Sequence, residues 1–119
     1  MNREYRDYIN DIIDAIKSTQ DFSNQMNFDT FSHDKKTIFA ISRALEIIGE
    51  AVKKIPISMR KEYSSIPWKD LAGMRDKLIH NYSGVNLNII WETVKQELPP
   101  LLKEFEGVLQ YLEHQIPKV

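Results

Sequence analysis

The stretch of sequence that decides the fold lies between residues 35 and 56 and is KKTIFAISRALEIIGEAVKKIP. Its apolar side chains recur every three or four residues, which places them on one face of an α-helix. They are Ile38, Ile41, Leu45, Ile48, Val52 and Ile55. Asp34 is a favourable N-cap, and Pro56 lacks the backbone N–H that a further helical turn would need. A long amphipathic helix is therefore predicted between Asp34 and Pro56.

The N-terminal side repeats this periodicity. Apolar side chains at helical spacing predict an amphipathic helix over about residues 3–20. Residues 21–33 are instead rich in Asn, Asp and Ser, and they predict a loop with at most one helical turn. Three aromatic side chains in this loop are expected to pin it to the core: Phe22, Phe28 and Phe31.

On the C-terminal side a short element is expected at residues 60–65, followed by a third major helix. Pro67 suits the first position of that helix, because its missing N–H has no partner there in any case. The helix is predicted to run through LAGMRDKLIHNY, residues 71–82, and to end near Gly84.

The rest of the chain predicts two more helical segments. Asn86 is placed to cap a helix over residues 87–98, and a last apolar segment follows Pro99 and Pro100. No segment shows the alternation of a strand. The fold class predicted is therefore all-α, an antiparallel helical bundle that forms a single domain of residues 1–119.

The amino-acid composition excludes several classes of protein and of site. The chain has 119 residues, 16 Lys and Arg against 17 Asp and Glu, and no cysteine, which excludes disulfides and thiolate zinc sites. The three histidines, His33, His80 and His114, are too far apart in sequence for a local metal cluster, so no metal is expected. No apolar run suits a membrane span, and no signal-peptide pattern is present, so no membrane partner and a cytoplasmic location are expected.

The net charge of −1 is not evenly distributed. Residues 51–80 carry seven basic and three acidic side chains, a local charge of +4, and the rest of the chain carries −5. A basic segment of this kind can attract a phosphate backbone, above all if two chains place it around one cleft. The overall charge therefore does not exclude a nucleic-acid partner.

The chemistry is concentrated in residues 73–82, GMRDKLIHNY. On a helix with about 100° per residue, Leu71, Met74 and Leu78 form the buried face. Tyr82 lies within about 20° of Arg75, at the edge of that face. Asp76 and His80 are neighbours four residues apart on the opposite side. Arg75 and His80 are about 140° apart, so one straight helix does not aim both at one atom.

Two interpretations of this segment are open. In the first, Arg75 lies along the edge of the core and His80 is a surface histidine paired with Asp76. In the second, Gly73 weakens the helix because another backbone comes close, for instance a second copy of the chain. In a two-fold dimer His80 of one chain and Arg75 of the other would reach a common cleft.

The string Arg75-x4-His80-x-Tyr82 resembles the Arg-x4-His-x-Tyr motif of HEPN-domain ribonucleases, in particular the HepT toxin group. The flanking sequences IPWKDLAGMRDKLIHNY, GVNLNIIWETV and LEIIGEAVKK are similar to that group as well, and the resemblance covers nearly the whole chain. It implies a HEPN-like bundle, a homodimer with a composite cleft, and a metal-independent endoribonuclease that acts on RNA without a cofactor.

The resemblance also implies a setting. HepT-like toxins belong to prokaryotic type VII-like toxin–antitoxin systems, in which the usual partner is a small nucleotidyltransferase antitoxin of the MntA type. That antitoxin transfers AMP to the motif tyrosine, which here is Tyr82.

Roles follow for the motif residues. His80 suits proton transfer, because imidazole titrates near neutral pH. Arg75 suits a phosphate, because its permanent charge makes forked hydrogen bonds. Asp76 can orient the imidazole, although this position is frequently Asn in the family. Tyr82 can stack on a base or bond a phosphate, and it is equally a core-edge tyrosine.

Other candidates have simpler explanations. Glu46 and Glu50 are a possible carboxylate pair, but with Arg43 they favour a solvated or dimer-facing ion-pair surface. Trp68 and Trp91 are expected to be core anchors rather than base-stacking platforms. His33 is expected at a loop or helix start and His114 on the surface.

Two other functions compete with the ribonuclease. A non-catalytic helical dimer that serves as binding partner or substrate of a nucleotidyltransferase would share the fold and the partner. A helix-turn-helix DNA-binding protein is disfavoured, because neither major helix presents a run of basic and amide side chains.

Overall fold

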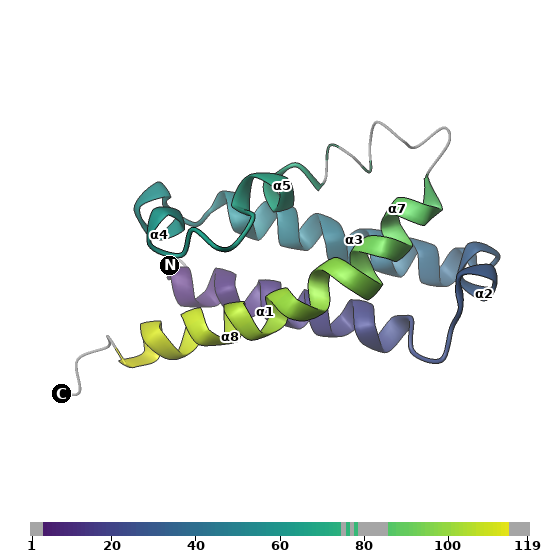
Figure 1. The fold of residues 1–119 in the computed structure, drawn as a ribbon, viewed down its shortest axis with the longest axis horizontal. Helices are drawn as coiled ribbons and strands as arrows, with labels where there is room; N and C mark the ends of the chain where they lie inside the picture. The colour runs from purple at the N-terminus through teal and green to yellow at the C-terminus, as the bar shows by residue number, and fades with distance from the viewer. Residues whose placement is uncertain (1–3, 75, 77, 79–85, 115–119) are drawn as a thin grey trace.

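The structure is a computed structural model that describes residues 4–74, 76, 78 and 86–114. Three long helices make up its body: α1 (Tyr5–Phe22), α3 (Lys35–Lys53) and α8 (Leu98–His114). Figure 1 shows α3 running back along α1, and α8 crossing the same layer toward the end at which α1 begins. All regular structure in the described residues is helical, which confirms the predicted all-α bundle.

The core is the apolar face of these three helices. Ile9, Ile12 and Ile16 of α1 are completely buried, and so are Ile41 and Ile48 of α3. Helix α8 adds four more buried side chains to this core: Leu98, Leu101, Phe105 and Val108. The predicted stripe of α3 is confirmed except at Ile38, which is half-buried.

The starts of α1 and α3 are set by local polar bonds. Helix α1 begins and ends two residues later than predicted, and Glu4 and Asp7 form a capping box at its start. The Asp34 side chain accepts the N–H of Thr37 at 3.1 Å, so the predicted N-cap of α3 is confirmed.

The connection between α1 and α3 contains one short helix, α2 (Phe28–Ser32), as the sequence predicts. The ring of Phe31 is fully buried and lies 5.0 Å from that of Trp91, measured between ring centroids. Lys95 places its ammonium 4.9 Å from the centre of the Trp91 ring and donates to the carbonyl of Ser23 at 3.1 Å. Phe28 and Phe31 therefore hold this loop on the core, whereas Phe22 is the last residue of α1 and is exposed, so the prediction is wrong for that side chain.

The helices around Pro99 and Pro100 differ from the prediction. Instead of two separate helices, α7 (Leu87–Glu92) leads through a π-helix, η2 (Thr93–Glu97), directly into α8. The N–H of Leu98 bonds the carbonyl of Thr93, five residues back. Pro99 and Pro100 then fall in the first turn of α8, where a missing N–H costs little. The wider π turn lets the helical rod continue past both prolines.

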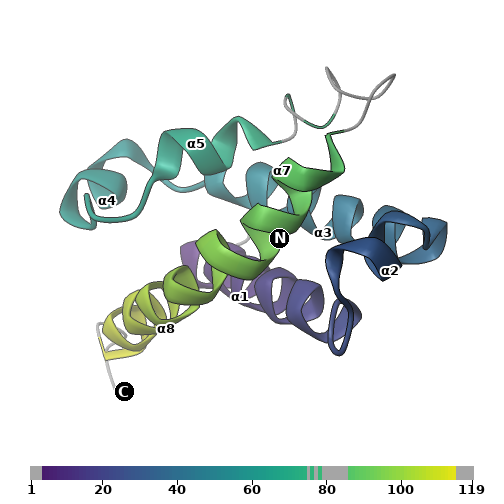
Figure 2. The same cartoon turned by 45° about the vertical axis from the view of Figure 1, so that its right-hand side comes forward.

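The short helices α4 (Ile57–Glu62) and α5 (Trp68–Ala72) follow α3; α4 lies beyond the end of α3, and α5 leads back over it (Figure 2). The long helix ends at Lys53, with Lys54 as its C-cap, so it stops before the predicted end at Pro56, and Pro56 serves instead as the N-cap of α4. Burial, together with the nearby Glu62 and Tyr111, raises the pKa of the Tyr63 phenol above its ordinary value, so this hydroxyl stays neutral at physiological pH.

Arg60 closes the C-terminal end of α3. Its Nε donates to the carbonyl of Ile55 and its Nη2 to that of Val52, both at 2.9 Å. Val52 lies in the last turn of α3, and its carbonyl also accepts the N–H of Ile55 at 3.1 Å, whereas Ile55 lies two residues beyond the helix. One guanidinium fork therefore joins the last turn of α3 to the chain that follows it. Among the basic residues counted in residues 51–80, this one has a structural role.

None of the helices in the described parts of the chain is both long and apolar enough to cross a bilayer.

We expect Arg60→Ala to lower the free energy of unfolding by about 1–3 kcal/mol, because it leaves two carbonyls without their charged donor. Arg60→Lys should recover only part of the loss, since an ammonium cannot reproduce the fork. Urea unfolding followed by circular dichroism measures both variants. Lys61→Ala, which removes the same charge from the next residue, is the control, and equal unfolding midpoints for Arg60→Ala and Lys61→Ala would contradict the capping role.

Candidate functional site

The predicted site lies in the segment that joins α5 to α7. Of its four predicted residues, the structure describes Asp76, which is helical and exposed. Arg75, His80 and Tyr82 lie outside the described residues. The structure therefore provides the geometry of the two helices that flank this segment, α5 and α7. Within the segment it describes Met74, Asp76 and Leu78.

The first anchor is α5. The Trp68 indole is buried, its Nε1 donates to the carbonyl of Tyr63 at 3.0 Å, and its ring meets Phe105 of α8 edge-on at 5.6 Å. Leu71, one turn on, is also buried, and α5 as a whole packs on α3. This confirms Trp68 as a core anchor. It also fixes the start of the motif-bearing segment on two of the long helices.

The helix predicted from Pro67 is interrupted. Pro67 is the N-cap of α5 rather than its first residue, and α5 ends at Ala72 with Gly73 as its C-cap. The N–H of Gly73 still donates to the carbonyl of Lys69 at 3.0 Å, and Met74, Asp76 and Leu78 are helical again. The predicted single helix is therefore wrong at Gly73, where the missing side chain weakens helix continuation.

The two faces of the segment are as predicted despite this break. Met74 is buried, Leu78 is half-buried and Asp76 is exposed. The apolar side of the motif-bearing segment thus faces the bundle, while the position of Asp76 faces away from it. The carboxylate of Asp76 is accordingly available to a group outside the core.

Gly73 has space around it. A Cβ built on this residue would lie 3.5 Å from the carbonyl oxygen of Lys69 and 3.7 Å from that of Asp70, both ordinary van der Waals distances. Its φ of −80° is accessible to any residue. The described residues of a single chain therefore give no reason for a glycine at this position.

The second anchor is α7. Asn86 accepts the N–H of Ile89 at 3.3 Å, which confirms the predicted cap. Ile90 is buried, and the ring of Trp91 packs against Phe28 and Phe31 of α2. The described helices on the two sides of residues 79–85 are thus anchored, α5 on α3 and α8, and α7 on the aromatic side chains of α2.

A cavity of about 330 Å³ lies under the motif-bearing segment. Met74 and Leu78 line it from one side, and Ile89, Ile90 and Leu101 line it from the other. Its described lining includes the acidic residues Asp70 and Glu97 but no Lys, Arg or His. An aliphatic, acidic cavity does not suit a phosphate, so the described lining of this cavity is not a phosphate-binding site.

The remaining candidates have structural roles. Arg43 Nη1 lies 3.2 Å from Glu46 and 3.9 Å from Glu50, which confirms the exposed ion-pair surface. His33 is exposed at the end of α2, and His114 is exposed at the end of α8. In the described ranges no three His, Cys, Asp or Glu side chains are grouped so as to hold a metal ion.

Sequence patterns did not reveal the role of Arg60, because a charge count treats all basic residues alike. The only hint was its position a few residues beyond the end of a predicted helix, where cations bond the last carbonyls.

Comparison with known proteins gives the family. The family model described as "Ribonuclease HepT-like" matches residues 12–108 of the chain. "Probable ribonuclease HepT" of Thermococcus cleftensis is 48% identical over 106 residues, which cover 89% of this chain and 96% of that protein. "Putative RNase MJ0125" of Methanocaldococcus jannaschii is 45% identical over 111 residues, or 93% and 96% of the two chains.

No solved structure matches the chain significantly. The family model alone spans most of the sequence, and the two relatives are covered almost end to end. The chain therefore belongs to the HepT-like ribonuclease family.

Proposed function

We propose that this protein is a metal-independent endoribonuclease, the toxin of a prokaryotic type VII-like toxin–antitoxin pair. The observation that carries the proposal is the intact string Arg75-x4-His80-x-Tyr82 in a chain of the HepT-like ribonuclease family. The described residues support it with a rigid frame, because the segment that contains the string is anchored by Trp68 on one side and Trp91 on the other.

The reaction needs two groups that the motif contains. His80 takes the proton of a ribose 2′-OH, and the 2′ oxygen attacks the adjacent phosphorus. The bond from phosphorus to the 5′ oxygen breaks, a proton passes to that oxygen, and the products are a 2′,3′-cyclic phosphate and a 5′-hydroxyl. Arg75 stabilises the charge on the phosphoryl oxygens with two parallel hydrogen bonds. Asp76, one turn before His80 in sequence, is a positioning residue for the imidazole.

Two chains complete the cleft in this proposal. Arg75 and His80 are about 140° apart on a regular helix, so the pair that acts on one phosphate comes from two protomers. The glycine supports this arrangement, because the described residues of one chain do not require it and the missing side chain lets a second backbone come close.

Regulation by a nucleotidyltransferase antitoxin is the next part of the proposal. The antitoxin would join AMP to the Tyr82 hydroxyl, with pyrophosphate as the leaving group when ATP is the donor. On a regular helix Tyr82 and Arg75 share one side. The added phosphodiester would therefore bring a negative charge and an adenosine to the position that the substrate phosphate occupies. The second candidate function, a non-catalytic dimer modified by such an enzyme, keeps this step and lacks the cleavage.

We expect His80→Ala to lower the rate of RNA cleavage by about 10²–10⁴-fold, because it removes the general base. Gel electrophoresis of RNA incubated with purified protein measures the rate, and growth on induction measures toxicity. His114→Ala, an exposed histidine far along the chain, should behave like the unaltered protein.

Equal cleavage and equal growth for the unaltered protein and His80→Ala would contradict the ribonuclease and leave the non-catalytic dimer. Cleavage should also persist in EDTA, and its loss there would contradict the metal-independent mechanism.

We expect Tyr82→Phe to remain a toxin that its antitoxin no longer modifies. Transfer of radiolabelled AMP in the presence of the antitoxin and ATP measures the modification. Tyr111→Phe, which removes a half-exposed hydroxyl on α8, should still be labelled. Undiminished labelling of Tyr82→Phe would show that another residue is the acceptor.

We expect Gly73→Ala to weaken dimerisation without harming the fold, because its Cβ fits within one chain but would fill the space needed by a second. Sedimentation equilibrium over a range of concentrations measures the dimer, and thermal unfolding measures stability. Gly107→Ala on α8 is the matched control, since no described atom lies within 4 Å of the added Cβ. Indistinguishable dimer dissociation constants for the two variants would contradict a close approach at Gly73.

A further inference from the structure

A second feature of the surface lies outside the motif, between α4 and α5. It is a shallow hollow of about 390 Å³, here called the α4–α5 hollow. Its lining includes two exposed lysines, Lys61 and Lys69, and the apolar side chains of Ile57 and Pro67. Arg60 and Asp70 also reach it, so the described lining has more positive than negative charge.

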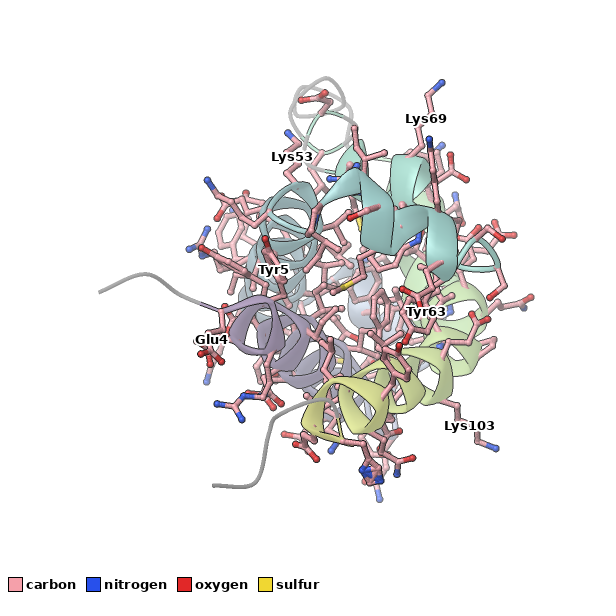
Figure 3. All side chains as sticks on the ribbon, turned by 90° about the vertical axis from the view of Figure 1, so that its left-hand side faces the viewer. Glu4, Tyr5, Lys53, Tyr63, Lys69 and Lys103 are labelled. Carbon is pink, nitrogen blue, oxygen red and sulfur yellow. The ribbon has the colours of Figure 1, made fainter. Side chains whose placement is uncertain are left out.

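The lysines at this hollow have no structural task in the described parts of the chain. The ion pairs found there involve Arg6, Arg43 and His33, and none includes Lys61 or Lys69. The carbonyls at the end of α3 are already bonded by Arg60. Two further exposed lysines, Lys53 and Lys54, follow that end of α3. In Figure 3 Lys53 and Lys69 both lie in the upper part of the view, and Lys103 lies in the lower part.

The apolar part of the hollow is unusual for a surface. Ile57 is 67% exposed, the largest exposed fraction among the large apolar side chains of the described residues. An aliphatic surface beside two ammonium groups matches a nucleotide, which has a flat base and a charged phosphate. A protein partner with an acidic surface would be attracted by the two lysines alone. It would give no role to the exposed Ile57.

The hollow lies close to the predicted motif in the sequence. Lys69 lies on α5, and its carbonyl accepts the N–H of Gly73 at 3.0 Å. Arg75 follows Gly73 by two positions in the sequence. Helix α5 therefore joins this hollow to the motif-bearing segment.

We infer that the α4–α5 hollow binds a nucleotide of the single-stranded RNA substrate outside the cleavage site. Lys61 and Lys69 contact its phosphate, and the side chain of Ile57 contacts its base. This inference rests on the proposed ribonuclease function and adds a binding site for the flanking strand.

The test measures binding separately from cleavage. The probe is a fluorescently labelled RNA oligonucleotide with 2′-O-methyl riboses, which cannot be cut through the 2′-OH. Fluorescence anisotropy at several salt concentrations gives the slope of log K against log salt. We expect the double variant Lys61→Ala/Lys69→Ala to reduce the magnitude of this slope by about 0.7, because the one phosphate that both lysines contact contributes about 0.7 for a single strand. Lys17→Ala/Lys103→Ala, two exposed lysines elsewhere, should leave it unchanged.

Ile57→Ser separates the base contact from the phosphate contact. It should weaken binding at every salt concentration and leave the slope unchanged, because an apolar contact releases no counterions. Thermal unfolding of each variant shows that the fold is retained.

The outcomes separate this inference from the proposed function. If the unaltered protein cleaves RNA and both double variants have its slope, the hollow does not bind RNA, although the ribonuclease stands. If Ile57→Ser binds like the unaltered protein, the base contact is wrong. If the unaltered protein neither binds the probe nor cleaves unmodified RNA, both proposals fail.

Discussion

The aliphatic seam between α1 and α3 is the interaction on which the rest of the structure depends. Ile12 and Ile16 on one helix and Ile41, Leu45 and Ile48 on the other are at most 1% exposed. Complete burial of such a side chain contributes about 1.5–3 kcal/mol. Because α1 and α3 are joined by a loop that α2 and its aromatic side chains hold in place, this pair forms a platform onto which α5, α7 and α8 pack.

Two tryptophans hold the helices that flank the site, α5 and α7, against the rest of the bundle. Trp68 connects α5 to α8 by its contact with Phe105, and Trp91 connects α7 to α2 by its contacts with two phenylalanines. The two rings flank the motif in the sequence, seven residues before Arg75 and nine residues after Tyr82. Their contacts fix the described helices on both sides of the motif. A ribonuclease needs such positioning, because a displacement of about 1 Å at the reacting atoms can cost 10²-fold in rate.

Much of the fold could be predicted from the sequence, because local rules decide it. The stripe of α3, the caps at Asp34 and Asn86, and the burial of Leu71 and Met74 all follow from spacing and hydrogen-bonding capacity. The continuous rod of α7, η2 and α8 could not be predicted. Whether Pro99 and Pro100 break a helix depends on the turn before them, and a π turn is selected by the packing of the whole rod.

The site was predictable only in part, for a different reason. A sequence shows which side chains share a face of one helix, and the structure confirms this for Met74 and Asp76. It does not show whether another chain approaches that face. The break at Gly73 illustrates the limit, because nothing within 3.4 Å of its added Cβ in the described chain requires a glycine there.

The charges of residues 51–80 show why composition alone misleads about an RNA partner. Their sum is +4, but the guanidinium of Arg60 is bonded to two backbone carbonyls, which leaves +3 for other interactions. An arginine is suited to that task because its planar fork matches two oxygens, whereas a lysine is a flexible and strongly hydrated point charge. Among the described residues of this segment, the fold places Arg60 at the helix end and four lysines in water: Lys53, Lys54, Lys61 and Lys69. Outside the motif, the charges available to a phosphate backbone are those of exposed lysines, and their number is set by the structure and not by the total of −1.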